Sequence, residues 1–222
     1  STMYHALALE DMLDLCNVLE AYADAVQPLW RATLEDWRGL IGPMRGWLAA
    51  MCHPDGEISL FNDAAFGIAP IPAELERYAD DLGLAPPGRA EMGVMHLAQS
   101  GYMRVVQNET VALLDVAPIG PDYLPGHGHA DILSFELSVF GQRVLVNSGT
   151  SCYGLSPERS RQRETAAHNT VVVDGMSSSE VWAGFRVARR ARPLELEIVR
   201  ESGVRVVCSH DGYRRLPGKP TH

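Results

Sequence analysis

Long hydrophobic runs, paired cysteines and an excess of positive charge are all missing from this 222-residue sequence. No stretch approaches the ~18 uninterrupted apolar residues that a membrane-spanning helix requires, so we predict no membrane span. The formal net charge is -9 at pH 7, whereas a protein that neutralises nucleic-acid phosphates needs a basic face. The sequence therefore argues against nucleic-acid binding, although an acidic average still permits a local cationic pocket for an acidic substrate.

The cysteine spacing excludes two common architectures. The four cysteines lie far apart and form no CxxC pair, which argues against a zinc ribbon and against a dense disulfide framework. We therefore expect buried free thiols. These residues are Cys16, Cys52, Cys152 and Cys208. The first residues also lack the charged start and apolar run of a signal peptide, so no compartment, periplasmic or cytoplasmic, is predicted.

The first part of the chain has a helical pattern. Between Leu9 and Leu19, apolar residues recur at steps of three and four, with acidic residues mostly between them. Pro28 suits the first turn of a second helix, whose apolar stripe reaches Met51. Gly42-Pro43 interrupts that stripe, and proline removes a backbone donor, so we expect a kink or break there. Residues 1–56 are predicted to be helical.

The pattern changes period later in the chain. Residues 57–88 are predicted to form a linker region with one short helix, and Pro86–Gly88 marks its end. Residues 89–222 contain short β-branched segments separated by Gly, Asn and Asp, including a predicted strand at Thr170–Asp174, and are predicted to form an antiparallel β-sandwich. Helices followed by strands indicate an α+β fold without alternating βαβ units.

Two helices cannot bury both faces of their own apolar stripes. We therefore expect the chain to be the later part of a longer helical domain followed by the start of a β domain. The chain would then be a fragment of a longer protein.

The strongest local signal for chemistry is Gly126–Asp131, which reads GHGHAD. Two imidazoles and a carboxylate lie within five residues, and the glycines allow tight turns, so the segment suits a metal or acid–base site. A polar loop entering a strand is an equally good interpretation. His168–Thr170 precedes an apolar run, where a histidine is more often structural. Val146–Thr150, between the two, runs into a glycine turn.

Together, these pieces resemble the heparinase II/III-like family of polysaccharide lyases. The resemblance covers nearly the whole chain, and the HxHxD…NSGT…HNT series is its specific part. The matching segments are residues 126–150, 161–175, 178–193 and 3–15. The resemblance implies the last helices of an (α/α) toroid followed by an antiparallel β-sandwich, with the active site between them.

The resemblance also implies roles for individual residues. Tyr4 resembles the tyrosine that exchanges a proton with the sugar, and His127 resembles the active-site histidine. His129 and His168 resemble ligands of a zinc ion. The family's third ligand is usually an aspartate, but this chain has Asn147. Because a neutral amide oxygen is a poorer zinc ligand than a carboxylate, zinc would bind weakly, a hydrogen-bond network would replace it, or Asp131 would supply the carboxylate.

The implied reaction is β-elimination from an acidic, uronic-acid-containing polysaccharide such as heparan or alginate. The reaction needs a base, an acid for the leaving oxygen and a cation for the carboxylate. Tyrosine has a pKa near 10, so it serves as base only beside positive charge. Among several arginines that are mostly expected on a solvated face, Arg163 is the preferred substrate-binding residue because it lies five residues before His168. Tyr153 is a weaker candidate for a substrate contact.

Two rival interpretations remain open. The metallo-β-lactamase group of metallohydrolases also uses HxHxD but places a further histidine where this chain has Ile132. A non-catalytic β-sandwich that binds acidic glycans or a partner is the second rival, and Asn147 favours it. The family's asparagine or histidine from an earlier helix has no match here, so we predict that this chain alone has little or no lyase activity.

The metal hypothesis makes a geometric demand. If Gly141-Gln142 forms a tight turn and Phe140 pairs with Arg143, a continued strand would carry His129 about 23 Å from Asn147. The two residues can share an ion only if residues 126–132 fold back as a loop.

Overall fold

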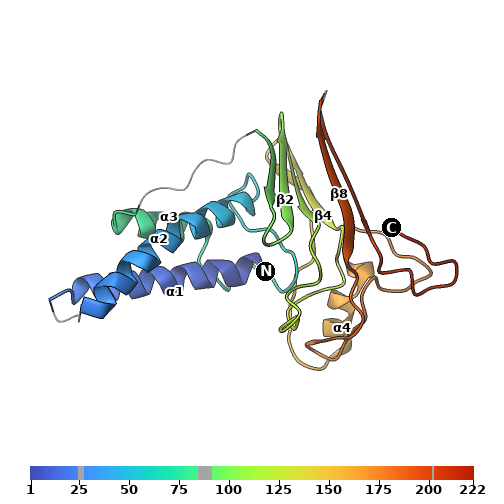
Figure 1. Ribbon diagram of the computed structural model, residues 1–222, viewed down its shortest axis with the longest axis horizontal. Coiled ribbons are helices and arrows are strands. Elements are labelled where there is room, and N and C mark those ends of the chain that lie inside the picture. Colours follow the sequence, from blue (N-terminus) through green and yellow to red (C-terminus); the bar gives the residue numbers. More distant parts are fainter. Residues whose placement is uncertain (25–27, 85–91, 202) are drawn as a thin grey trace. The chain divides into compact units, whose positions relative to one another are not determined.

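The computed structural model describes residues 1–24, 28–84, 92–201 and 203–222. These residues form two compact units, each built from more than one stretch of the sequence (Figure 1). One unit comprises Thr2–Ile58 and Phe66–Ala90, and the other comprises Ser1, Ser59–Ala65 and Glu91–His222. The first unit is helical and the second is rich in antiparallel strands, which confirms the predicted α+β class. No helix within the described ranges is both long and apolar enough to span a membrane.

The helical unit contains three helices that pack against one another. They are α1 (Thr2–Ala21), α2 (Pro28–Ala50) and α3 (Pro72–Asp81). Leu9, Leu13 and Cys16 of α1 are fully buried, at the steps of three and four that the sequence predicts. The prediction that these helices close a longer (α/α) toroid stays a prediction.

Helix α2 is continuous through Pro43, so the predicted break at Gly42-Pro43 is wrong. Proline removes one backbone hydrogen bond, but Ile41 and Leu48 on either side of it are buried. Tertiary packing of an apolar face contributes more to helix stability than a single backbone bond. Arg45 fastens the same part of α2 to α3, since its buried guanidinium lies 2.6 Å from Glu76 and 2.8 Å from Asp80.

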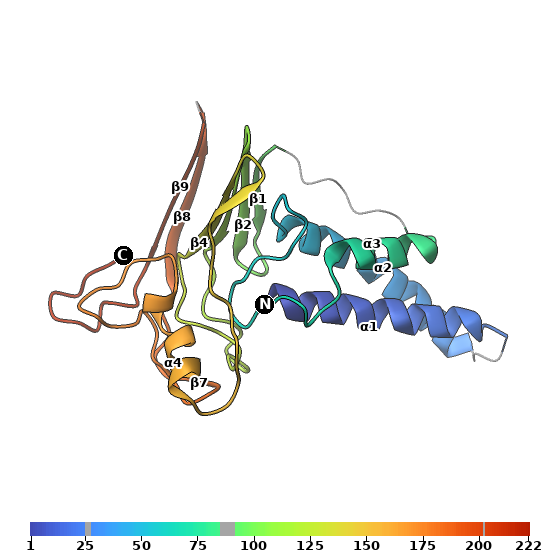
Figure 2. The ribbon, with the colours of Figure 1, turned by 180° about the vertical axis from the view of Figure 1, so that it is seen from behind.

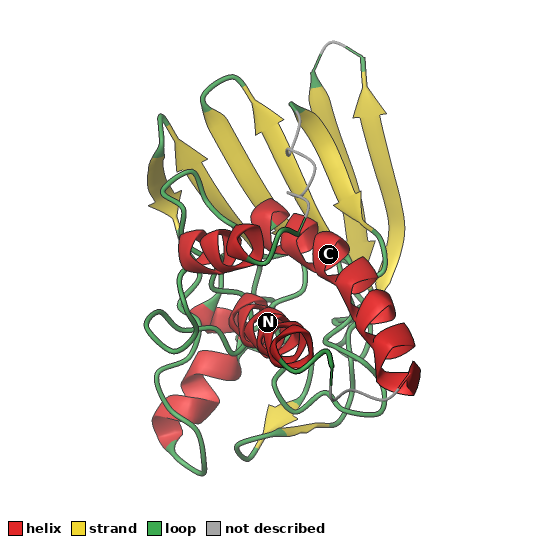
Figure 3. Ribbon diagram, turned by 90° about the vertical axis from the view of Figure 1, so that its left-hand side faces the viewer, coloured by secondary structure: helices red, strands yellow, loops and turns green. Residues whose placement is uncertain are grey.

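The strand-rich unit is built around a five-stranded antiparallel sheet in the order β1-β2-β3-β4-β5 (Figure 3). Its strands are β1 (Gly93–Leu97), β2 (Tyr102–Gln107), β3 (Thr110–Asp115), β4 (Phe135–Val139) and β5 (Gln142–Leu145). Side chains of β3 alternate between buried and partly exposed positions, with Val111, Leu113 and Asp115 turned inward. This alternation is the period of two expected for a strand with one covered face.

Two two-stranded ladders and a small helix complete this unit. They are β6 (Val181–Trp182) with β7 (Arg186–Val187), β8 (Pro193–Arg200) with β9 (Val204–His210), and α4 (Pro157–Arg163) with the 3₁₀ turn η1 (Thr165–Ala167). Figures 1 and 2 show the β8–β9 hairpin running alongside the five-stranded sheet. Ser156 caps α4, because its side chain accepts a hydrogen bond from the backbone N–H of Arg159, the usual role of serine at an N-cap.

The hairpin between β4 and β5 turns one residue earlier than predicted. Val139 pairs with Gln142, so Phe140 and Gly141 occupy the turn, with φ values of 51° and 76°. A two-residue hairpin turn with positive φ at both central positions fits the right-handed twist of the strands. The predicted pairing of Phe140 with Arg143 is therefore wrong.

The predicted strand at Thr170–Asp174 does not form in the structure. This segment contains one isolated bridge, between Val173 and Met176, and Val171 and Val172 are 49% and 37% exposed. A short apolar run indicates a strand only if a neighbouring strand covers it. Here the run instead leads into a turn at Asp174, whose φ is 52°.

Residues 59–65, which the sequence assigns to a linker, belong to the strand-rich unit. The backbone N–H of Leu60 donates to Glu136 at 2.6 Å, and the Asn62 amide donates to the Tyr102 hydroxyl at 2.8 Å. The carbonyl of Ala64 accepts from the N–H of Thr150 at 2.9 Å. These bonds fix the segment against the sheet and bury Asp63 completely. The predicted boundary at Pro86–Gly88 lies outside the described residues.

All four cysteines are free thiols, as predicted. Cys16 and Cys52 are buried, whereas Cys152 and Cys208 are partly exposed. The expectation of burial therefore holds for the two thiols of the helical unit.

Candidate functional site

The candidate site is centred on Asp63, whose side chain is 0% exposed. One carboxylate oxygen lies 2.8 Å from Nδ1 of His127, and the other lies 2.8 Å from Nε2 of His129. Arg159 donates to both oxygens, with Nη2 at 2.8 Å from Oδ2 and Nη1 bonded to Oδ1. A bidentate arginine is the strongest geometric match for a carboxylate. One buried carboxylate thus orients two imidazoles and a guanidinium.

The charge of Asp63 decides which proton each histidine carries. Burial alone would raise the pKa of Asp63, but hydrogen bonds from His129, Arg159 and His127 lower it to about 2. An ionised carboxylate can only accept hydrogen bonds. His127 must therefore donate through Nδ1, and His129 must donate through Nε2. In the neutral rings, the lone pair then lies on Nε2 of His127 and on Nδ1 of His129.

The loop that carries both histidines folds back instead of continuing β4. Residues 126–132 contain no strand, which satisfies the geometric demand of the metal hypothesis. A Cβ atom on Gly128 would lie 2.2 Å from the carbonyl oxygen of Ile119, so this close approach requires glycine. The Asn62 side chain accepts from the backbone N–H of His129 at 2.9 Å. The N–H of Ala130 bonds to the carbonyl of Arg163 at 2.8 Å.

His168 and Asn147 form a second buried pair beside His129. Nδ1 of His168 lies 2.6 Å from Oδ1 of Asn147, which also accepts the backbone N–H of Ser148 at 2.9 Å. Since this oxygen accepts, His168 donates through Nδ1 and keeps the lone pair on Nε2. Burial, helped by the nearby His129, lowers the pKa of His168 to about 3. Burial also lowers the pKa of His129, although Asp63 opposes it.

The two imidazoles that the resemblance assigns to zinc lie together. The ring centroids of His129 and His168 are 5.2 Å apart. Nδ1 of His129 and Nε2 of His168 are both buried without a hydrogen-bond partner. Two neutral imidazole nitrogens with free lone pairs are a zinc-like donor set, so these two residues fit a metal ion.

The third ligand position fits zinc less well. The oxygen of Asn147 already accepts two hydrogen bonds, and its buried Nδ2 has no partner. Within the described part of the chain, no three His, Cys, Asp or Glu side chains are placed to share a metal ion. Asp131 is not placed in such a group with His129 and His168, and its role as the missing carboxylate stays a prediction. Burial instead raises the pKa of Asp131 to about 7.

An aromatic rim lies next to His127 and is open to solvent. Tyr153 and Phe185 are 46% and 44% exposed, and their rings stack with centroids 5.7 Å apart. The His127 ring is nearly perpendicular to both, with its centroid 6.2 Å from that of Tyr153 and 5.8 Å from that of Phe185. The Arg159 guanidinium lies 5.3 Å from each ring centroid, within the range of cation–π attraction. The arrangement presents two ring faces beside a histidine whose side chain is 46% exposed.

Arg163, predicted to bind substrate, is fully buried. Its Nε and Nη2 donate to the carbonyl of Gly128 at 3.1 Å and 3.0 Å, and Nη1 lies near carbonyls of residues 182–186. Burial lowers its pKa to about 10. A guanidinium with these partners fastens two loops, which differs from the substrate-binding role predicted for it. Its neighbour Arg159 is the arginine that pairs with the central carboxylate.

Sequence reasoning found the histidines but missed Asp63 and Phe185. Asp63 lies in a segment assigned to a linker, far from the histidine motif in sequence, and no spacing rule connects the two. Phe185 lies within residues 178–193, one of the segments that resemble the family. Its place in that segment is the one feature of the sequence that could have identified it as a site residue. Tyr4 lies on α1 of the helical unit and is 36% exposed, and its catalytic role stays a prediction.

Comparisons with known proteins place the chain in a family and agree with its fold. The family model for heparinase II/III-like proteins, C-terminal, matches residues 91–222. A crystal structure of heparinase III is similar over 96% of this chain and 36% of its own length, with 17% identity and a TM-score of 0.70. The heparan sulfate lyase HepC from Pedobacter heparinus is similar over 96% of this chain and 34% of its own length, with 19% identity and a TM-score of 0.60. The chain thus spans about a third of the solved structures it matches. No curated protein matches it significantly.

Proposed function

The chain belongs to the heparinase II/III-like family, and from this premise we propose that the longer protein containing it is a polysaccharide lyase. Its proposed substrate is an acidic, uronic-acid-containing polysaccharide. Structural neighbours titled heparinase III and heparan sulfate lyase support this substrate class. The observation that carries the proposal is Asp63, which holds His127 at a solvent-exposed, aromatic-lined rim.

The proposed reaction is β-elimination. The C–H bond next to the uronate carboxylate breaks, and its electron pair forms a carbon–carbon double bond as the bond to the leaving glycosidic oxygen breaks. One protein group must take the proton, and the leaving oxygen must receive one. The carboxylate also needs a nearby positive charge or hydrogen-bond donor, because neutralising it makes the adjacent proton more acidic.

His127 is the proposed active-site histidine of the strand-rich unit. Asp63 holds the Nδ1–H of His127, so Nε2 is the nitrogen that can exchange a proton or donate to the substrate once protonated. A buried carboxylate behind a histidine fixes its tautomer and the orientation of its ring. Arg159 offsets the negative charge of Asp63 and helps to keep this carboxylate ionised by lowering its pKa.

Tyr4 and Tyr153 have different proposed roles. Tyr4 is the proposed proton-transfer residue and needs nearby positive charge to act as base, since an unperturbed tyrosine has a pKa near 10. Tyr153, together with Phe185, is proposed to contact the sugar. Two exposed, stacked rings offer flat apolar faces to a pyranose, and aromatic side chains bury large areas at low entropic cost.

A zinc ion is proposed to bind weakly between His129 and His168, through Nδ1 and Nε2 respectively. Such an ion would supply structural cross-linking and local positive charge. Asn147 contributes by holding the Nδ1–H of His168, so that Nε2 keeps its lone pair. Asp63 does the same for His129 through Nε2–H. Outer partners of this kind orient metal-binding histidines.

The test is turnover by the full-length protein, measured as the absorbance of the unsaturated product. We expect His127→Ala to reduce kcat by ~10²–10⁴, the usual contribution of a general acid or base. Tyr4→Phe should abolish turnover while binding of the polysaccharide persists. The matched controls are His96→Ala and Tyr22→Phe, since both residues are exposed, and both should leave kcat unchanged. This chain alone should show little or no turnover.

The alternative function is binding of acidic glycans without catalysis, which the amide at Asn147 favours. That alternative predicts that the full-length protein binds glycans but forms no unsaturated product. It also predicts that Tyr4→Phe leaves glycan binding unchanged. Unchanged turnover in both His127→Ala and Tyr4→Phe would overturn the proposed lyase mechanism.

A further inference from the structure

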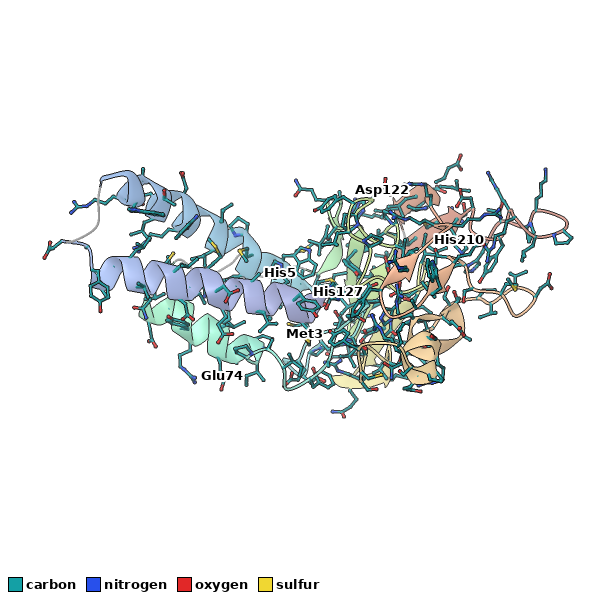
Figure 4. All side chains as sticks on the ribbon, turned by 90° about the horizontal axis from the view of Figure 1, so that it is seen from below. Met3, His5, Glu74, Asp122, His127 and His210 are labelled. Carbon is teal, nitrogen blue, oxygen red and sulfur yellow. The ribbon has the colours of Figure 1, made fainter. Side chains whose placement is uncertain are left out.

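The strand-rich unit also contains a charged pocket whose lining residues differ from those around Asp63. It has a volume of about 400 Å³ and is lined by Asp122, Ala188, Arg190 and Arg192. The pocket is shallow and open to solvent. Asp122, which is labelled in Figure 4, lies in the same loop as His127, because residues 116–134 contain no helix or strand. The two arginines lie between β7 and β8.

The backbone fixes which side chains face this pocket. Residues 188, 190 and 192 line it, whereas Ala191 is 1% exposed and its N–H donates to the Ser179 hydroxyl at 2.9 Å. Arg189 instead pairs with Glu180. Ala188 adds only a small, uncharged side chain to this lining. Alternate residues of this segment thus have different roles. The side chains of Arg190 and Arg192 line the pocket, whereas the backbone groups of residues 189 and 191 bond to Glu180 and Ser179.

One exposed carboxylate is shared by both guanidiniums. Nη1 of Arg190 lies 2.8 Å from Oδ1 of Asp122, and Nη2 lies 3.2 Å from its carbonyl oxygen. Nη2 of Arg192 lies 3.1 Å from Oδ1 and 3.4 Å from Oδ2 of Asp122. Asp122 is 70% exposed and Arg192 is 55% exposed. The pocket carries one more positive than negative charge, in a chain whose net charge is -9.

Exposed ion pairs are weak, typically ~0–1 kcal/mol, so an incoming anion can replace Asp122. Guanidiniums recognise planar or tetrahedral oxyanions by paired hydrogen bonds. We propose that Arg190 and Arg192 bind a sulfate or carboxylate group of an acidic saccharide, with Asp122 as the internal group that the anion displaces. That the ligand is a saccharide rests on the proposed function, whereas the oxyanion site itself does not.

The test is isothermal titration of the full-length protein carrying His127→Ala, so that bound oligosaccharide is not consumed. A sulfated heparan tetrasaccharide and its desulfated counterpart distinguish sulfate from carboxylate recognition, and inorganic sulfate tests the bare site. We expect Arg190→Gln and Arg192→Gln each to weaken tetrasaccharide binding by tenfold or more. Asp122→Asn should tighten binding several-fold, because it removes the competing carboxylate.

The matched control is Arg189→Gln, which removes the same charge one residue away but outside the pocket. It should change affinity less than twofold. Equal weakening by Arg189→Gln and Arg190→Gln would mean diffuse attraction and would overturn the site, as would unchanged or weaker binding by Asp122→Asn. A gain of affinity cannot arise from misfolding, so this variant keeps the test decisive. Absence of turnover by the unmodified full-length protein, with Arg190-dependent binding intact, would sink the lyase proposal and leave this site standing.

Discussion

Two of the arginine–carboxylate clusters among the described residues of the strand-rich unit differ in burial. In the first, Asp63 and Arg159 are both 0% exposed, and the carboxylate is filled by a bidentate guanidinium and two imidazoles. In the second, Asp122 is 70% exposed and is shared between Arg190 and Arg192. Exchanging a partner of a buried ion pair costs much free energy, because removing one partner leaves a buried charge uncompensated. We therefore assign positioning to the first cluster and reversible anion binding to the second.

The largest expected effect is that of Asp63→Asn. This change leaves the Arg159 charge buried without its carboxylate, which costs ~3–5 kcal/mol of unfolding free energy, and it frees the His127 ring, so turnover should also be lost. Denaturant unfolding measures the first effect. Glu158→Gln is the control, because Glu158 pairs with Arg161 on the surface and should change neither. Equal stability of Asp63→Asn and the unmodified protein would contradict the difference between the clusters.

The second prediction extends the burial argument to His210, which is 0% exposed. Burial, with the nearby His222, lowers its pKa to about 4. Between pH 6.5 and 4 the unfolded chain takes up a proton that the folded His210 does not, so unfolding free energy should fall as pH decreases. His210 should contribute on the order of 2–3 kcal/mol to this loss.

Urea unfolding at pH 7, 5 and 4 measures this dependence. His210→Asn should flatten the curve, and the exposed His96→Asn should not. A pH profile that is the same with and without His210 would rule out its buried, neutral state.

The third prediction adds a carboxylate to a buried site. Asn147→Asp places a negative charge beside the two histidines, where it can still accept from His168 and Ser148, and a carboxylate in this position strengthens zinc binding more than a neutral amide does. Zinc affinity of the metal-free protein should rise ~10–100-fold, as measured by competition with a chelating dye. His168→Ala should abolish binding. No gain in affinity would mean that Asn147 lies outside the zinc site.

The smallest expected effect is that of Asp122→Asn on stability. Its ion pairs are exposed, so unfolding free energy should change by no more than ~0.5 kcal/mol. Thermal unfolding at low and moderate salt checks this. A loss comparable to that of Asp63→Asn would show that the surface cluster is structural.

Local pattern predicted much of the fold. Steps of three and four placed α1, and β-branched segments between turn residues placed most strands of the sheet. The error at Pro43 arose because propensity rules ignore packing, and the error at Thr170–Asp174 arose because an apolar run does not reveal whether a neighbouring strand covers it. The hairpin register was missed by one residue, because Phe140 adopts positive φ next to Gly141.

For the candidate site, the sequence predicted the histidines of the recognised motifs but not the residues that hold them in place. His127, His129 and His168 lie in segments that carry the resemblance, and the folded-back loop brings His129 beside His168. Asp63 could not be predicted, because its role depends on a crossing of residues 59–65 over the sheet, which is a tertiary contact. Arg163 has the right charge and spacing for substrate binding, but burial directs it to carbonyl groups.

The central claim is that ionised Asp63 fixes opposite tautomers in its two histidines. Nitrogen-15 NMR of the imidazole side chains in metal-free protein at pH 7 tests it directly. The structure requires a proton on Nδ1 of His127 and on Nε2 of His129, and Asp63→Asn should release the first. A proton on Nε2 of neutral His127 in the unmodified protein would contradict the account.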